Sequence, residues 1–192
     1  ASVAAMSALS YSEKVSDLWF APAGFNRGGI GDGSAKYGID ITDTADHLTA
    51  RQRDDLYEVG INPIASFVSE GIVVFGQKTL QIEKSALDRI NVRRLLIYIK
   101  RHIASFAKNV LFEQNIQSTW SSFANQVNPF LDGVKAGGGV VEYKLILDET
   151  TTTPDLIDQN AMYAKIIIKP AKAIEFILLD FVITNQGAVF SE

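Results

Sequence analysis

The chain has no cysteine and few of the residues from which active sites are most often built. Of its 192 residues none is cysteine and only two, His47 and His102, are histidine. A chain without cysteine has no disulfide, no thiolate metal site and no cysteine nucleophile. The two histidines are far apart, and no zinc-binding histidine motif or serine-nucleophile motif is present. The sequence therefore predicts no catalytic site, no metal site and no bound cofactor.

Long apolar runs and a strong net charge are also missing. No apolar run reaches the roughly 18 residues that a membrane-spanning helix needs, so no membrane insertion is expected. The net charge is −4, which argues against a general nucleic-acid binder. Ala1 stands where an initiator methionine would be, and no signal-peptide pattern follows it. This start predicts a fragment or a processed product.

Two short stretches have the composition of a binding site but not its spacing. Four glycines between Gly28 and Gly33 could form a phosphate loop, but the Gly-Lys-Ser/Thr sequence of a Walker loop does not follow. Asp40, Asp43 and Asp46 recur at every third position, which does not fit a calcium-binding EF-hand loop. The pattern therefore predicts a plain loop and a solvated turn.

The rest of the sequence has the composition of an ordinary folded protein. Hydrophobic residues make up 47% of the chain and charged residues 21%, and this length can bury a core. No repeat or internal domain boundary is evident, so residues 1–192 are expected to form one module. We divide it into an N-terminal segment (1–18), a core (19–173) and a C-terminal strand and arm (174–192).

A long amphipathic helix is predicted from Asn91 to Gln114, with Asn91 as its N-cap. Apolar residues recur at spacings of three and four along one side, namely Val92, Leu96, Ile99, Ile103, Phe106 and Val110. The opposite side collects basic residues, namely Arg93, Arg94, Lys100, Arg101 and Lys108. Such a basic face is either simply solvated or contacts an acidic partner.

Other patterns complete an α+β fold with a mixed β-sheet and helices packed on it. Helices are expected over residues 1–9, over 49–60 with Thr49 as cap and Leu56 and Val59 facing inward, and over 118–134 with a break or kink at Pro129. Strands are expected at 72–76 with 78–82 as partner or continuation, and at 141–147, 162–169 and 174–184. The last strand is apolar on both sides, which suits pairing with the edge of another sheet.

Several short motifs, in this order, resemble those of a known family. They are Trp19-x-Ala-Pro-Ala-Gly24, Gly60-Ile-Asn-Pro-Ile64, Val74-Phe-Gly-Gln-Lys-Thr-Leu80, Asn91-Val-Arg-Arg-Leu95, Phe112-Glu-Gln-Asn115 and Trp120. Together they resemble the C-terminal module of contractile-tail sheath proteins, which occur in phage tails and related injection machines. Gln114 departs from the pattern, because the family often has proline after the Phe-Glu pair.

The resemblance implies a structural subunit, not an enzyme. Such a subunit polymerises as stacked rings around a tail tube and contracts to drive the tube through a host envelope. The implied partners are neighbouring sheath subunits, the tail tube protein, the baseplate and the tail terminator. The implied location is the virion tail, assembled in the host cytoplasm.

Two surfaces follow from this resemblance. The basic residues Arg93, Arg94, Lys100, Arg101 and Lys108 would contact the tube, and terminal arms would exchange strands between subunits. On the C-terminal side the expected exchange residues are Ile174, Phe176, Leu178, Phe181 and Ile183. An N-terminal donor arm is expected to be absent or too short, because the chain starts close to Trp19.

Two other classes of function remain open at this point. A nucleic-acid-binding module would use the basic face of the 91–114 helix on phosphates, and its binding would depend steeply on salt. An enzyme with a dyad assembled in space would show a deep polar pocket.

Overall fold

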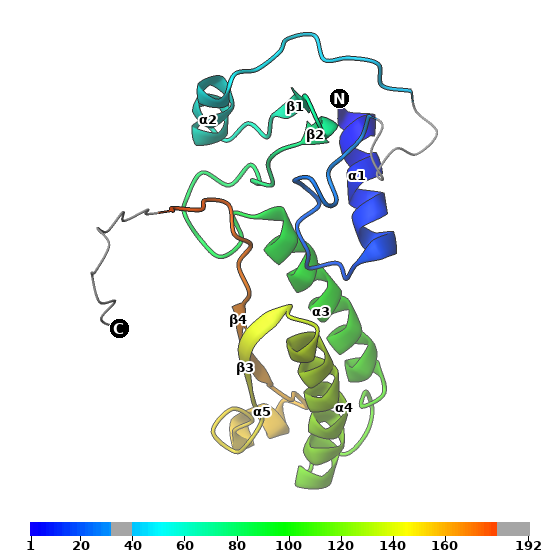
Figure 1. Cartoon of the computed structure of the whole chain (residues 1–192). Helices are drawn as coiled ribbons and strands as arrows, with labels where there is room; N and C mark the ends of the chain where they lie inside the picture. Colours follow the sequence, from blue (N-terminus) through cyan, green and yellow to red (C-terminus); the bar gives the residue numbers. More distant parts are fainter. Residues whose placement is uncertain (32–39, 180–192) are drawn as a thin grey trace, which may run out of the picture.

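The protein is elongated, with one helix joining its two ends. The computed structural model describes residues 1–31 and 40–179. The described elements are α1 (Ser2–Val15), α2 (Ala50–Glu58), β1 (Ile64–Phe67), β2 (Gly71–Val74), α3 (Ile90–Lys108), α4 (Gln117–Ala136), β3 (Val140–Ile146), α5 (Pro154–Asp158) and β4 (Lys165–Pro170). In Figure 1 the elements α1, α2, β1 and β2 form the upper end, and α4, α5, β3 and β4 form the lower end. Helix α3 begins below these upper elements and runs down beside α4 into the lower end.

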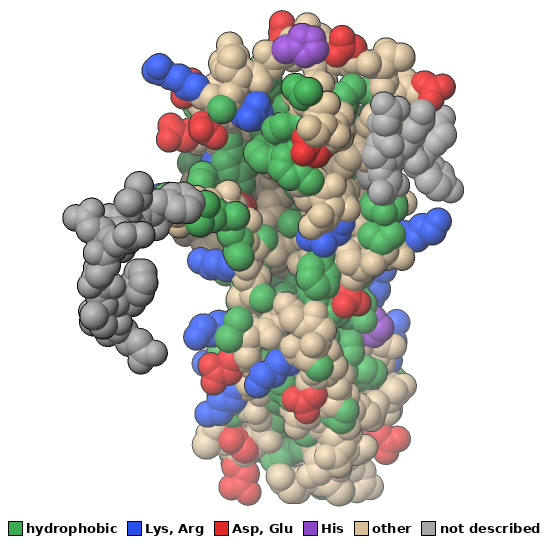
Figure 2. All heavy atoms as spheres, in the orientation of Figure 1, with side chains coloured by type: hydrophobic (Ala, Val, Ile, Leu, Met, Phe, Trp, Pro, Cys, Tyr) green, Lys and Arg blue, Asp and Glu red, His purple; other side chains and the backbone are tan. Residues whose placement is uncertain are grey.

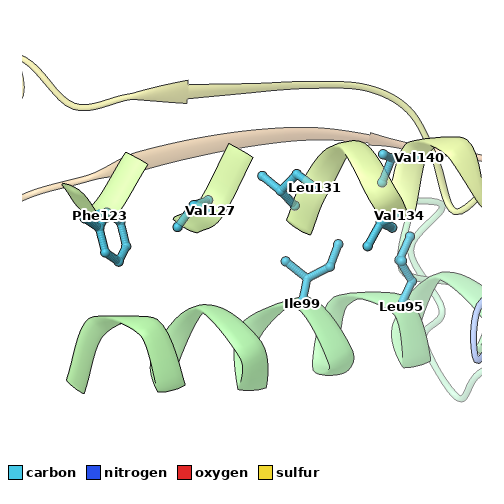
Figure 3. Packing of buried hydrophobic residues seen from close by; sticks show 7 residues of the cluster. All are labelled: Leu95, Ile99, Phe123, Val127, Leu131, Val134 and Val140. Atoms are coloured by element: carbon cyan, nitrogen blue, oxygen red, sulfur yellow. The ribbon is translucent and has the colours of Figure 1, made fainter. Parts of the chain in front are cut away.

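The lower end is built on the pairing of α3 with α4. Leu95 and Ile99 of α3 point toward α4, where Phe123, Val127 and Leu131 meet them (Figure 3). The predicted apolar side of α4 is therefore confirmed. On α3, Ile99 is buried as predicted, but Leu95 takes the place in the core that was predicted for Leu96, which is only half-buried. This cluster also includes Val134 and Val140, and β3 and β4 cover the other side of α4.

Helix α4 contains Pro129 but continues through it to Ala136. A break or a kink was predicted at this proline, and the helix is not broken there. Proline removes one amide donor, which leaves the carbonyl of Asn125 without its helical partner. Asn125 and Pro129 are both exposed, so water can satisfy that carbonyl and the helix loses little.

The strands form two separate antiparallel pairs. β3 pairs with β4 from Val140↔Pro170 to Ile146↔Lys165, with an irregularity in register after Val140. β1 pairs with β2 from Ile64↔Val74 to Phe67↔Gly71. The predicted α+β class is confirmed. Among residues 1–31 and 40–179, however, the strands form two two-stranded sheets and not one mixed sheet.

The partner of β2 differs from the expected one. The segment 78–82 was predicted to pair with β2 or to continue it, but β1 is the partner. Asn62 explains the difference: its side chain donates to the carbonyl of Lys78 at 2.8 Å and accepts from the amide of Lys78 at 2.7 Å. The backbone around Lys78 is therefore held by this side chain, and Gly76 has no Cβ that would collide with Asn62 and Tyr57.

Residues 29 and 30 pack on the outer edge of β2, and α1 packs on them from the N-terminal segment. Gly29 forms a bridge with Val73, and the amide of Ile30 donates to the carbonyl of Ile72 at 2.8 Å. Ala8 of α1 joins Ile30 and Ile72 in a second buried cluster. Helix α1 extends to Val15, beyond the expected end at residue 9, because Ala4, Ala8 and Ser12 form a buried side on this cluster.

Helix α2 keeps its predicted start. The Thr49 side chain accepts from the amide of Gln52, and the Gln52 side chain accepts from the amide of Thr49, which is a capping box. Leu56 is half-buried, as predicted, but Val59 is exposed and not inward-facing. Val59 lies beyond the last helical residue, Glu58.

The N-cap residue of α3 differs from the predicted one. Asn91 was expected to be the N-cap, but it lies inside the first turn, and Arg89 is the N-cap residue. The amide of Ile90 donates instead to the carbonyl of Gln77 at 2.8 Å. Asn91 is buried and donates to the carbonyl of Trp19 at 3.3 Å. Its role is to hold the Trp19 segment and not to cap the helix.

The end of α3 also differs from the prediction. The helix ends at Lys108 and not at Gln114, and Phe112 has a left-handed φ of 68°. Residues 109–112 form turns after the helix, and the conformation of Phe112 redirects the chain there. Asn115 then accepts from the indole of Trp120 at 2.7 Å and donates to the carbonyl of Ala161 at 2.9 Å. It thus ties α4 to the segment before β4.

Candidate interaction surfaces

One side of α3 carries a row of exposed cations. Arg93, Lys100, Arg101 and Lys108 are exposed on the side opposite to the face that packs on α4. We call these four residues the basic stripe. In the described part of the chain none of them forms an ion pair. Their charges are therefore available to a partner.

Arg94 does not belong to this row. Its side chain is 16% exposed, and it contacts Glu13 of α1 at 3.3 Å. Burial lowers the pKa of Arg94, and Glu13 opposes that change. Of the five basic residues predicted to bind a partner, four lie together, and Arg94 lies between α1 and α3.

The second candidate surface is the segment after β4. Residues 171–179 have no strand or helix, and Ile174, Phe176 and Leu178 are 83%, 73% and 97% exposed. The predicted strand 174–184 is therefore wrong for residues 174–179, because no neighbouring strand meets them there. Phe181 and Ile183 lie outside the described residues. Figure 2 shows apolar side chains where this segment leaves the body, on the left.

One side chain in this segment is held firmly. The Glu175 carboxylate accepts two hydrogen bonds from Arg89, at 2.6 and 2.9 Å, and a third from the Gln77 amide at 3.3 Å. Burial raises the pKa of Glu175, but hydrogen bonds and the charge of Arg89 outweigh it, so the pKa lies below its usual value. Burial and the nearby Glu175 carboxylate raise the pKa of Tyr57, the neighbour from α2.

Sequence reasoning missed this contact. Glu175 is the only charged residue between Ile174 and Leu179. A single carboxylate in an apolar run is a signal for a specific partner, because an unpaired charge there is costly to bury. That partner, Arg89, lies 86 residues away in the sequence, so no local pattern identifies it.

The β3–β4 sheet offers edges on which another strand could pair. In the described residues it has two strands only, so each strand has one edge without a partner strand. One face packs on the lower core through Tyr143, Leu145 and Ile168, among others. The β1–β2 sheet has fewer free edges, because the segment around Gly29 already pairs with the outer edge of β2.

The remaining candidate residues have local, structural surroundings. Asp43 contacts His47 at 3.9 Å and accepts from the amide of Thr44, both within one exposed turn. No group of metal-binding side chains occurs in the ranges 1–31 and 40–179. His102 stacks on Phe130 with ring centroids 4.9 Å apart.

The glycine-rich stretch lies partly outside the described residues, as Gly33 does. Gly28 is packed so closely on β2 that a Cβ would lie 2.6 Å from the carbonyl oxygen of Val74. This contact is structural. None of the helices within the described ranges is long and apolar enough to cross a membrane.

The comparisons with known proteins all indicate the same family. Residues 83–184 match the family described as the phage tail sheath C-terminal domain. The chain is 42% identical over 183 residues to the tail sheath protein of Vibrio phage KVP40, and 40% identical over 181 residues to that of Enterobacteria phage T4. These alignments cover 95% and 94% of this chain but 26% of each relative. The chain thus spans about a quarter of the length of these curated relatives.

Solved structures of contractile machines share the fold. A chain of the anti-feeding prophage baseplate superposes with a TM-score of 0.78 at 25% identity, covering 91% of this chain and 48% of that one. The same values hold for a chain of an extracellular contractile injection system, the PVC sheath complex in its contracted state.

Proposed function

The chain belongs to the phage tail sheath C-terminal domain family, and we propose that it is part of a structural subunit of a contractile tail sheath. The subunit polymerises around a tail tube and contracts to drive the tube through a host envelope. The observation that carries this proposal is the identity of about two fifths to tail sheath proteins along almost the whole chain. The family is structural, in agreement with the prediction that the chain is not an enzyme.

The proposed partners follow from this role. Neighbouring sheath subunits are the first, since the similar solved chains come from a baseplate and a sheath complex. The tail tube, the baseplate and the tail terminator are further proposed partners. The proposed location is the virion tail, after assembly in the host cytoplasm.

We assign the tube contact to the basic stripe. Its four cations have no ion-pair partner in the described part of the chain, and the side of α3 that bears them is not needed for the packing on α4. Clustered exposed charges steer association with a surface of opposite sign. The proposal therefore requires an acidic tube surface. Arg94, which was in the predicted set, would act indirectly by holding α3 against α1.

We assign subunit exchange to the segment that begins at Ile174. Its described apolar side chains, Ile174 to Leu179 apart from Glu175, are mostly exposed, and an added strand satisfies both its own backbone groups and those of a sheet edge. The β3–β4 sheet of a neighbouring subunit is the proposed acceptor, because its edges have no partner strand among the described residues.

Charge reversal in the basic stripe tests the tube contact. In the sheath subunit that carries this domain, Arg93→Glu, Lys100→Glu and Arg101→Glu together should leave the melting temperature nearly unchanged, because exposed charges contribute only about 0–1 kcal/mol each. The same variant should fail to coat purified tail tubes in negative-stain electron microscopy. Normal coating by this variant would show that the tube contact lies elsewhere.

A matched control has the same change in charge at another place. Lys14, Arg51 and Lys135 are also exposed, and their replacement by Glu should leave the coating of tubes intact. Steep salt-dependent binding of the unmodified subunit to DNA or RNA, without tube binding, would favour the nucleic-acid alternative instead. The named relatives are tail sheath proteins and give that alternative no support.

A further inference from the structure

The segment after β4 is attached to the body at only a few points. The amide of Ala171 donates to the carbonyl of Gly139 at 3.0 Å, and Glu175 forms the ion pair described above. Beyond it Phe176, Leu178 and Leu179 are mostly exposed. In Figure 1 the segment rises from β4 toward the start of α3 and then turns away from the body.

The residues that receive Glu175 come from a well-fixed junction. Arg89 is the N-cap residue of α3 and forms a backbone bridge with Lys78. Gln77 is buried, and its carbonyl accepts from the first helical amide, that of Ile90. Tyr57 of α2 lies against the same place, with the guanidinium of Arg89 5.9 Å from its ring centroid. A side chain bound here is therefore fixed relative to α2 and α3 together.

The contact has a geometry that favours one orientation. Two parallel hydrogen bonds between a guanidinium and a carboxylate fix direction as well as distance. The side chains of Arg89 and Glu175 are 26% and 16% exposed, so water screens the pair only in part. Lysine cannot reproduce this two-bond arrangement.

We propose that Glu175, held by Arg89 and Gln77, is the positioning residue that fixes where the C-terminal segment leaves the body and in which direction it is presented to a neighbouring subunit. This inference rests on the proposed function, since a direction of presentation matters only if the segment pairs elsewhere. We call the three residues the arm clamp.

For Leu179, the last described residue, the clamp halves the length of chain that joins it to the body. A flexible chain from Ala171 to Leu179 has a root-mean-square length of about 16 Å, whereas one from Glu175 to Leu179 has about 11 Å. The effective concentration of a tethered group falls roughly with the −3/2 power of tether length. Loss of the clamp should thus lower the effective concentration of Leu179 at a neighbouring edge about three-fold at every junction.

Distance measurement by electron paramagnetic resonance tests the clamp directly. The chain has no cysteine, so spin labels on Leu178→Cys and on Ser122→Cys of α4 would be the only two labels. The unmodified clamp should give a narrow distance distribution, and Glu175→Gln should broaden it. The exchanged pair Arg89→Glu with Glu175→Arg should narrow it again. An unchanged distribution in Glu175→Gln would overturn the proposal.

A control variant separates the clamp from a general loss of ion pairs. Glu13→Gln removes the contact between Glu13 and Arg94, far from the segment, and should leave the distribution narrow. Circular dichroism should give the same helical content for all variants. If Glu13→Gln broadens the distribution as much as Glu175→Gln does, the clamp is not specific and the proposal fails.

Assembly measurements distinguish failure of the clamp from failure of the proposed function. In the sheath subunit that carries this domain, Glu175→Gln should slow polymerisation on tubes, and the exchanged pair should recover the rate. Equal rates for Glu175→Gln and the unmodified subunit would overturn the positioning role, even with a broadened distribution. If the unmodified subunit does not polymerise at all, the proposed function fails, whereas the distance measurement still decides whether the clamp exists.

Discussion

Asn115 shows how one side chain can join two distant parts of the chain. It accepts from Trp120 and donates to Ala161, so one amide group satisfies both a buried indole and a backbone carbonyl. Trp120 is 4% exposed. A buried donor that loses its acceptor costs its full desolvation free energy.

The variant Asn115→Ala should therefore lower the free energy of unfolding by about 1–3 kcal/mol. Urea unfolding followed by tryptophan fluorescence measures this change. Asn109→Ala is a suitable control, because Asn109 is exposed and its contact with Gln126, at 3.4 Å, is long. Equal effects of the two variants would contradict the structural role of Asn115.

Glu175 makes the arm clamp sensitive to acid. Its pKa in the folded chain lies below the usual value of 4.5, so the unfolded chain binds the proton more tightly than the folded one does. Stability from this group is therefore present above the usual pKa and is lost as the pH falls through the folded pKa. Among the described residues, the charged or titratable groups that face Glu175 are Arg89 and Tyr57, with Asp88 on the far side of Arg89.

We expect the distance distribution from Leu178 to broaden as the pH falls from about 6 to about 3. The Glu175→Gln variant should give a broad distribution at both ends of this range. A distribution that stays narrow in the unmodified chain at the acid end would mean that hydrogen bonds from Arg89 to the protonated carboxyl group suffice. Circular dichroism at each pH checks that the body remains folded.

At the level of elements, the pairing of α3 with α4 stabilises the lower end. Leu131 is fully buried in the cluster that the two helices share. The opposite side of α3 is polar, apart from Ile97, which is 53% exposed. The two sides of the helix thus have different roles: one contributes free energy of folding, and the other is open to a partner.

Leu131→Ala should lower the free energy of unfolding by about 2–5 kcal/mol, because it leaves a cavity among Ile99, Val127 and Val134. Ile97→Ala on the exposed side should change it by no more than about 0.5 kcal/mol. Urea unfolding of both variants provides the comparison. A large effect of Ile97→Ala alone would mean that the exposed side of α3 also packs within the chain.

At the level of the whole molecule, two buried clusters lie at opposite ends and α3 runs between them. The C-terminal segment belongs to neither cluster, and its apolar side chains remain exposed. A contiguous exposed apolar stretch of this kind marks an interaction site. We therefore expect its side chains to matter for assembly and not for folding.

Phe176→Asp together with Leu178→Asp tests this expectation. The melting temperature should stay close to that of the unmodified chain, because both side chains are exposed. Polymerisation of the sheath subunit, followed by sedimentation, should be lost, because the new charges would have to be buried in a neighbouring sheet. Val68→Asp, at the fully exposed Val68 after β1, serves as control. Normal polymerisation of the double variant would contradict strand exchange by this segment.

The sequence by itself determined the features that local spacing encodes. The apolar side of α4, most of the apolar side of α3 and the cap at Thr49 depend on neighbours within a few residues, and these were found. Leu96 and Val141 were predicted to face inward, but Leu95 and Val140 are the buried residues there. The order of motifs was sufficient to identify the family. Of the candidate site, the sequence predicted the four exposed cations of the basic stripe and the exposed apolar side chains after residue 173.

Only the tertiary structure decided which distant groups meet. Asn91 became a buried contact for Trp19 because Gln77 supplies the carbonyl that the first turn of α3 needs. Arg94 is not part of the exposed basic stripe, because α1 packs beside it and Glu13 of α1 pairs with it. Glu175 contacts Arg89 because the fold places the segment after β4 beside the start of α3. Hydrogen bonds and ion pairs between remote segments depend on how the two cores place those segments in space, and periodicity along the chain carries no information on that placement.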